Sequence, residues 1–138
     1  MNTLEAMKKI EEKAKELNRN EVRVVKNLPI GKAIRQGDLY VHRVADNHPI
    51  GDQLKIRQIA DGFTMGARHI LKGDVKVYEG KALPKYVNSR WPVGYAFRVG
   101  SEGAVLTHPE HAHIDLCDEG LYQVTHQMDI RTMQRVSD

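Results

Sequence analysis

The chain has 138 residues, 41% of them hydrophobic and 28% charged, with a formal net charge of +3, which suits one globular domain with its own core. No apolar run approaches the roughly 18 residues that cross a membrane, the N-terminus lacks a secretory signal, and the lone Cys117 excludes an internal disulfide or zinc held by paired cysteines. We therefore expect a cytoplasmic protein whose mild positive charge suits a small anionic ligand but does not by itself predict nucleic-acid binding.

Residues 3–18 are predicted to form one amphipathic helix. Asn2 and Glu5 have the spacing of a capping box. The apolar stripe consists of Leu4, Met7, Ile10, Ala14 and Leu17. The stripe can dock on the chain's own domain or on a second copy, which would make a homo-oligomer, and we favour the first because such a helix is marginal alone. We thus divide the chain into a helical extension at 1–20 and a single β-rich domain at 21–138.

After the helix, the hydrophobic period changes to two. Apolar residues alternate in short runs around residues 39–42, 54–57, 75–77, 95–99 and 122–124, and turns containing Gly or Asp separate these runs. Many short alternating runs are typical of an antiparallel sheet. The chain is therefore predicted to be mainly β, a small antiparallel β-barrel or sandwich with one N-terminal helix.

Three of the seven histidines lie within residues 108–113. Histidine is the commonest metal ligand and titrates nearest neutral pH, so such a cluster indicates chemistry. Because a residue before proline avoids the helical region, residues 103–108 are expected to form a strand that ends in a turn at Pro109 and Glu110. His108 and His111 would then flank the turn with Cβ atoms about 5 Å apart, a spacing that suits two imidazoles on one metal ion.

Residues 111–116 alternate after this turn, which places His111, His113 and Asp115 on one face of a strand. In an alternative interpretation Thr107 caps a helix that aligns His108, His111 and Asp115. The alternation favours the strand.

His69 is the best candidate for a third ligand. Thr64 and Arg68 add a hydroxyl and a cationic fork near it, which suits a phosphate or carboxylate as a substrate group. Three histidines with an open position are the usual plan of a catalytic zinc or iron site. The first hypothesis is thus a hydrolase or phosphodiesterase: His69, His108 and His111 hold a divalent metal (Zn, Fe or Mn) or share acid–base work, and Glu110 and His113 act as catalytic residues.

A second hypothesis is a non-catalytic accessory module that binds a nucleic acid, a nucleotide or a protein. Its basic residues would be Lys55, Arg57, Lys72, Lys76, Lys85, Arg90 and Arg98. Tyr or Trp side chains would supply stacking, and the histidines would point in unrelated directions. Under this reading the histidines are polar residues of a sheet face, as we also interpret His42, His48 and His126 to be.

Two resemblances bear on these hypotheses. His111-x-His113 in a β-rich chain is similar to the first motif of the cupins, as an architectural analogy that carries no function. Residues 36–138 resemble a family of small uncharacterised bacterial and phage proteins. The shared segments are Gln36-Gly37-Asp38, Gly62-x-Thr64-x-Gly66-x-x-His69, Thr107-His108-Pro109-Glu110-His111, Gly120-x-Tyr122-x-Val124-x-x-Gln127 and Val136-Ser137-Asp138.

In those relatives the middle motif often reads Gly-His-x-His, and its first His corresponds to Ala67 here, not to Arg68. The resemblance therefore implies a shared site at His69, His108 and His111. It implies no activity.

Overall fold

A computed structural model describes residues 22–61, 68–85, 87, 92–126, 128–129 and 134–135. All the regular structure in these residues is β-strand, which confirms the prediction of a mainly β chain, whereas the predicted helix at 3–18 lies outside the described residues. The strands are β1 (Val22–Val25), β2 (Ala33–Gln36), β3 (Leu39–Val44), β4 (Ile50–Leu54), β5 (Gln58–Asp61), β6 (Arg68–Gly80), β7 (Val93–Thr107), β8 (His113–Leu116), β9 (Gly120–His126), β10 (Met128–Asp129) and β11 (Gln134–Arg135).

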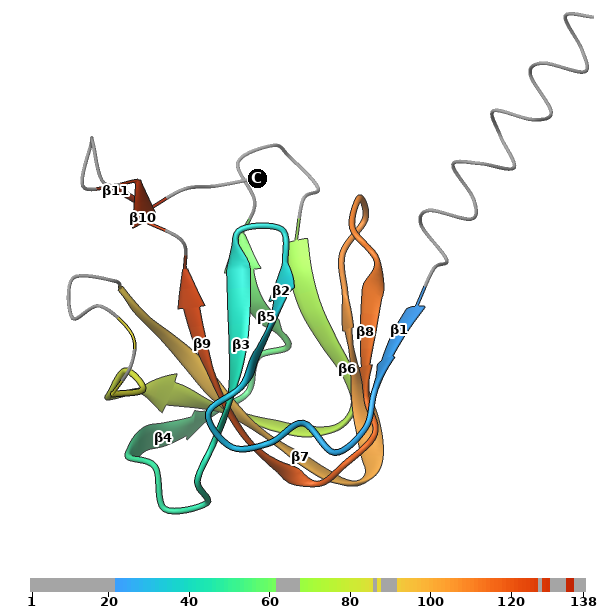
Figure 1. The fold of residues 1–138 in the computed structure, drawn as a ribbon, viewed down its shortest axis with the longest axis horizontal. Helices are drawn as coiled ribbons and strands as arrows, with labels where there is room; N and C mark the ends of the chain where they lie inside the picture. Colours follow the sequence, from blue (N-terminus) through green and yellow to red (C-terminus); the bar gives the residue numbers. More distant parts are fainter. Residues whose placement is uncertain are drawn as a thin grey trace, which may run out of the picture.

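Strands β1 to β9 form one sheet that curls into a half-barrel (Figure 1). Its order is β1-β8-β7-β9-β3-β2, and β6 pairs with the long strand β7 while β4 and β5 pair with β6. Neighbouring strands are antiparallel except β1, which runs parallel to β8. The half-barrel is open between its edge strands β1 and β2, and we call this opening the seam.

The curl depends on a bend in β6 and β7. Their register shifts between Gly73 and Val75, where Gly73 has φ +106° and Gly103 has φ +77°. A Cβ on Gly73 would lie 2.8 Å from the carbonyl oxygen of Gly103, so the two backbones touch where they bend. Glycine is required here because side chains rarely adopt positive φ and none would fit.

The core fills the concave side of the bent sheet. It consists of Leu39, Val41, Ile59, Leu71, Val77, Phe97, Val99, Ala104, Leu106, Ile114, Leu116, Tyr122 and Val124, each at most 2% exposed. Phe97 and Tyr122 stack with ring centroids 5.2 Å apart. No helix among the described residues is long and apolar enough to span a membrane.

Strand boundaries differ from the predicted ones in two places. Residues 95–99 and 103–108 were expected as separate strands. Both runs belong to β7, which passes through the bend without a break and ends at Thr107. The run at 54–57 is mostly a connection, because β4 ends at Leu54 and β5 begins at Gln58. Residues 108–112 form a turn between β7 and β8, which excludes a helix that starts at Thr107.

Three chain segments meet at one end of the half-barrel (Figure 1). They are the turn between β2 and β3, the first residues of β6, and the turn between β7 and β8. His69, His108 and His111 each lie on one of these segments.

Candidate functional site: a row of histidines that opens into an arginine-lined cavity

His69, His108 and His111 form a row. His69 and His108 are 0% and 1% exposed, whereas His111 is half-buried. The ring centroids of His69 and His108 are 4.5 Å apart, as are those of His108 and His111. The row therefore runs from the buried start of β6 to the surface turn between β7 and β8.

Gln36 fixes the inner end of this row. Its side-chain nitrogen donates to the carbonyl oxygens of Leu106 at 3.0 Å and Ala112 at 2.9 Å. The amide oxygen of Gln36 must then face the His69 Nδ1, 2.8 Å away. Because an amide oxygen only accepts, His69 carries a proton on Nδ1.

Asp38 lies on the other side of the His69 ring. Its Oδ1 is 3.5 Å from the His69 Nε2, and both side chains are fully buried. Asp38 and His69 thus face each other as a buried carboxyl and imidazole at the closed end of the row.

Two backbone amides fix the middle histidine. The Nδ1 of His108 accepts from the N–H of Glu110 at 3.0 Å and from the N–H of His111 at 3.2 Å. His108 is therefore the neutral tautomer with its proton on Nε2. The turn positions the ring of His108 between the other two histidines.

The outer end of the row opens into a cavity of about 510 Å³ at the seam between β1 and β2. Its lining residues are Arg23, Arg35, Gln36, Gly37, His111 and Ala112. Arg23 donates to the carbonyl oxygen of Arg35, which joins the two edge strands. The Nε of Arg35 donates to the carbonyl oxygen of Gly37, and its guanidinium lies over the Tyr40 ring, 5.5 Å from the centroid.

Sequence reasoning missed Gln36, Asp38, Arg23 and Arg35. Gln36-Gly37-Asp38 looked like a turn, and it is one, but its polar side chains point to His69. The only available signal in the sequence was that polar residues lie on both sides of Gly37. Nothing in the local sequence of Arg23 indicates that its side chain reaches the backbone of Arg35 in β2.

The other predicted site residues are Thr64, Arg68, Glu110 and His113. Arg68 is exposed, and strand alternation places it on the opposite face of β6 from His69. Glu110 is exposed in the turn, where its backbone positions His108. His113 is half-buried and begins β8, and Thr64 lies outside the described residues.

A metal ion has no ready set of ligands here. Among the described residues, no group of three or more His, Cys, Asp or Glu side chains is arranged to hold one. The Nε2 of His108 carries a proton, so it has no lone pair in the ring plane for a metal ion. The Nδ1 of His108 would have to lose two hydrogen bonds before it could bind a metal ion.

His42 and His126 are not solvent-facing polar residues, as we had interpreted them. They are 4% and 7% exposed. His42 Nε2 lies 2.7 Å from the Thr125 hydroxyl, and burial lowers its pKa to about 4. His42 is therefore a neutral core residue. The interpretation failed because β3, which carries His42, pairs with β9, which carries His126 and is buried on both faces.

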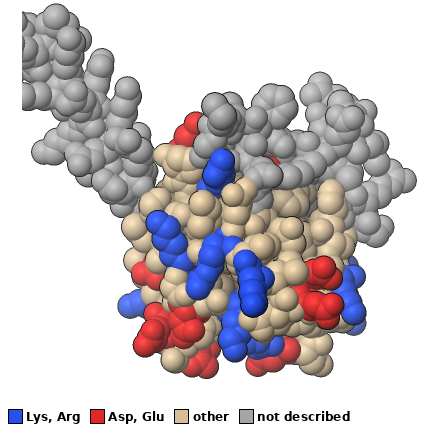
Figure 2. Space-filling view, turned by 180° about the vertical axis from the view of Figure 1, so that it is seen from behind, with Lys and Arg blue, Asp and Glu red and all other residues tan. Residues whose placement is uncertain are grey.

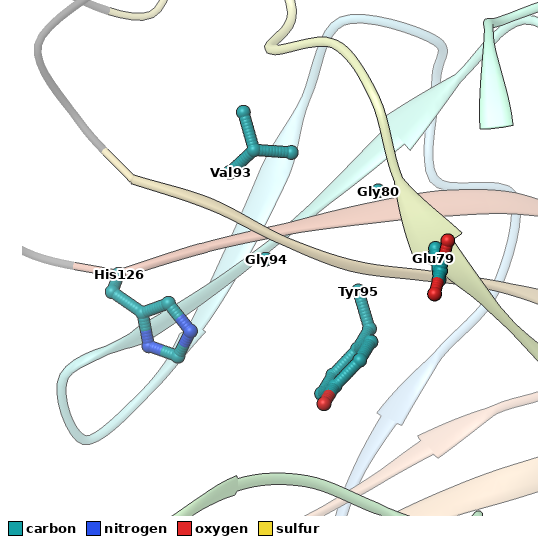
Figure 3. Close-up of a pocket in the computed structure, with 6 residues that line it drawn as sticks. All are labelled: Glu79, Gly80, Val93, Gly94, Tyr95 and His126. Atoms are coloured by element: carbon teal, nitrogen blue, oxygen red, sulfur yellow. The ribbon is translucent and has the colours of Figure 1, made fainter. Parts of the chain in front are cut away.

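A second cavity of about 430 Å³ lies where β6 ends, β7 begins and β9 ends. It is lined by Glu79, Gly80, Val93, Gly94, Tyr95 and His126. Figure 3 shows Tyr95 and His126 on one side of β7 and Val93 on the other. This cavity has a carboxylate and no arginine or lysine among its described lining residues, in contrast to the seam cavity.

One family model matches the chain. It is a domain of unknown function, DUF8820, and the match covers residues 35–127, more than half of the chain. The chain belongs to this family. The DUF8820 match contains Arg35, Gln36, Asp38 and the three histidines of the row, whereas Arg23 precedes it.

The DUF8820 match agrees with the expectation of an uncharacterised family, and it gives no support to the likeness to cupins. No curated protein and no solved structure shows significant similarity to the chain.

Proposed function

We propose that this protein is an acid–base enzyme that cleaves phosphate esters without a metal ion, with the seam cavity as its active site. The observation that carries the proposal is the position of His111. It is the one member of the histidine row that lines the cavity, and it shares this lining with two arginines.

Arg23 and Arg35 are suited to hold the phosphate. A guanidinium presents a planar set of donors that matches two phosphate oxygens, and it keeps its charge at any physiological pH. Contacts with backbone carbonyl oxygens and the Tyr40 ring orient both side chains before a ligand arrives. Such preorganisation lowers the ordering cost of binding.

His111 is suited to move the proton. When water attacks phosphorus and the bond to the leaving oxygen breaks, the water loses a proton and the leaving oxygen gains one. A protonated imidazole supplies the proton to the leaving oxygen, or a neutral one removes it from the water. His108 stands behind His111 in a fixed tautomer, so it positions the ring of His111 and does not compete for the proton.

The experiment is turnover of a nitrophenyl phosphodiester by protein treated with EDTA. General acid–base catalysis contributes about 10²- to 10⁴-fold, so His111→Gln should lower kcat by at least about 100-fold. Arg35→Gln should mainly raise KM, by about tenfold, because one charge-assisted phosphate contact is lost.

His48→Gln is the matched control for His111→Gln. His48 is a half-buried histidine whose Nε2 lies 3.0 Å from the carbonyl oxygen of Ala82, away from the seam cavity. Equal turnover by wild type and His111→Gln would overturn the proposal, as would activity that disappears with EDTA and returns with a metal ion.

A further inference from the structure

The outer side of the sheet opposite the seam carries a group of cations that the proposed active site does not use. Figure 2 shows Lys and Arg side chains gathered down the middle of this face, with Asp and Glu mostly toward its lower edges. The strands β5 and β6 lie behind β2 and β3 in Figure 1 and so come forward in this view. We define the basic strip as Arg57, Lys72, Lys76 and Arg98.

Strand alternation produces the strip. The even-numbered residues of β6 face outward, since Leu71 and Val77 are buried on the other side. Lys72 and Lys76 are thus exposed on one face of β6, four residues apart.

Neighbouring strands bring further cations to β6. Lys76 pairs directly with Arg98 of β7. The Nη1 of Arg57 donates to the carbonyl oxygen of Gly73, 3.0 Å away, which holds this guanidinium beside Lys72. Like charges that face each other across a sheet destabilise it, so the direct pairing of Lys76 with Arg98 favours a bound anion on this face.

Two carboxylates near the strip, Asp74 and Asp46, do not neutralise it. One is bonded to a backbone amide, and the other forms only an exposed ion pair. Asp74 accepts from the backbone N–H of Glu102 at 3.2 Å. Asp46 lies 3.4 Å from Arg98, but its side chain is 78% exposed, and exposed ion pairs contribute little. The strip of four cations therefore keeps an excess of positive charge over these two carboxylates.

An aromatic ring lies on the same face. Tyr78 follows Lys76 by two residues, is half-buried, and pairs with the buried Ala96 of β7. Cations that follow a strand, with an aromatic ring in line, are the arrangement that binds phosphates and stacks bases of single-stranded nucleic acid.

We propose that the basic strip binds single-stranded nucleic acid through its phosphates, with Tyr78 as a stacking surface. The proposal is independent of the seam cavity, and it stands whether or not that cavity is catalytic.

The test is fluorescence anisotropy with a labelled single-stranded oligonucleotide of mixed sequence, at several salt concentrations. Lys72→Gln/Lys76→Gln should raise Kd at least fivefold at low salt. It should also reduce the salt slope by about 1.4, since each lost phosphate contact on a single strand removes about 0.7.

Two controls make the outcome decisive. Lys26→Gln/Lys32→Gln removes two equally exposed lysines outside the strip and should leave Kd nearly unchanged. His111→Gln should also leave Kd unchanged, which separates this surface from the active site. No binding at low salt, or an equal loss of binding in the Lys26/Lys32 control, would overturn the proposal, and tighter binding of a duplex would overturn its single-stranded part.

Discussion

At the scale of single residues, Gln36 holds the site together. Its side chain joins three chain segments, because it bonds the backbone of Leu106 and of Ala112 as well as the ring of His69. Gln36 is 1% exposed, so no solvent would replace these bonds if they were lost. The order of the histidine row therefore depends on a residue that has no part in the proposed proton transfer.

Gln36→Leu should lower the free energy of unfolding by about 2 to 4 kcal/mol, because two carbonyl groups and the His69 Nδ1 lose a buried partner. Urea denaturation measures this change. Gln53→Ala, at an exposed position of β4, should change stability by less than about 0.5 kcal/mol. A loss for Gln36→Leu no larger than that of Gln53→Ala would contradict the assigned role.

His42 should make stability depend on pH. Its pKa is lowered from 6.5 to about 4 by burial, so between these values the unfolded chain binds a proton that the folded chain does not. The stabilising contribution is therefore complete above pH 6.5 and is lost as pH falls toward 4, by up to about 3 kcal/mol.

Unfolding measured from pH 7 to pH 4 tests this effect in the wild type and in His42→Gln, which keeps a polar partner for Thr125. The wild type should lose more stability than the variant over this range. Parallel pH curves for the two proteins would show that His42 takes up its proton equally in the folded and unfolded chains.

At the scale of elements, the bend of β6 and β7 brings the start of β6 to the turn between β7 and β8, and thus His69 to His108. Gly73→Ala should destabilise the protein by more than about 2 kcal/mol, because it combines positive φ with a Cβ 2.8 Å from a carbonyl oxygen. Gly31→Ala has a similar φ of +93° but no atom within 4 Å, so it isolates the cost of φ alone. Thermal unfolding of both variants checks the prediction, and equal losses would mean that the contact at the bend is unimportant.

The arrangement of the strands also explains which parts of the fold could be predicted from the sequence. Alternation predicted the mainly β fold and the strand at residues 39–42, since these patterns are local. It did not predict that residues 93–107 form one bent strand, because the bend is set by contact between Gly73 and Gly103, which are far apart in the chain. For the same reason it missed that β9 is buried on both faces.

The site was predictable in its histidines and not in their partners. Clustering marked His108 and His111, and two glycines marked the segment of His69. Arg35 of β2 and Asp38 in the turn after it reach the histidines only when the sheet curls, so no local spacing could assign them.

At the scale of the whole molecule, the half-barrel has an arginine-lined cavity at its open seam and a basic strip on the far side of the sheet. The histidine row has the buried contact of Asp38 with His69 at its closed end and a cavity at its other end. Three histidines in contact would ordinarily suggest a metal ion. The fixed tautomer of His108 opposes that reading.

Protein purified without a histidine tag should therefore contain less than stoichiometric zinc, iron or manganese by elemental mass spectrometry. EDTA should leave its melting temperature unchanged, since the part of the chain that the structure describes holds no set of metal ligands. Stoichiometric metal that disappears in His108→Ala/His111→Ala would contradict the metal-free account and would make the histidine row a metal centre.

The central claim is that the seam cavity takes a phosphate group beside His111, and NMR of protein with ¹⁵N-labelled histidine rings tests it most directly. A titration with inorganic phosphate should shift the His111 ring signals in a saturable manner and leave those of His42, which is buried beside Thr125, in place. In Arg35→Gln the same shift should require about tenfold more phosphate. A titration in which the His111 signals do not move, or move equally in wild type and Arg35→Gln, would contradict the claim.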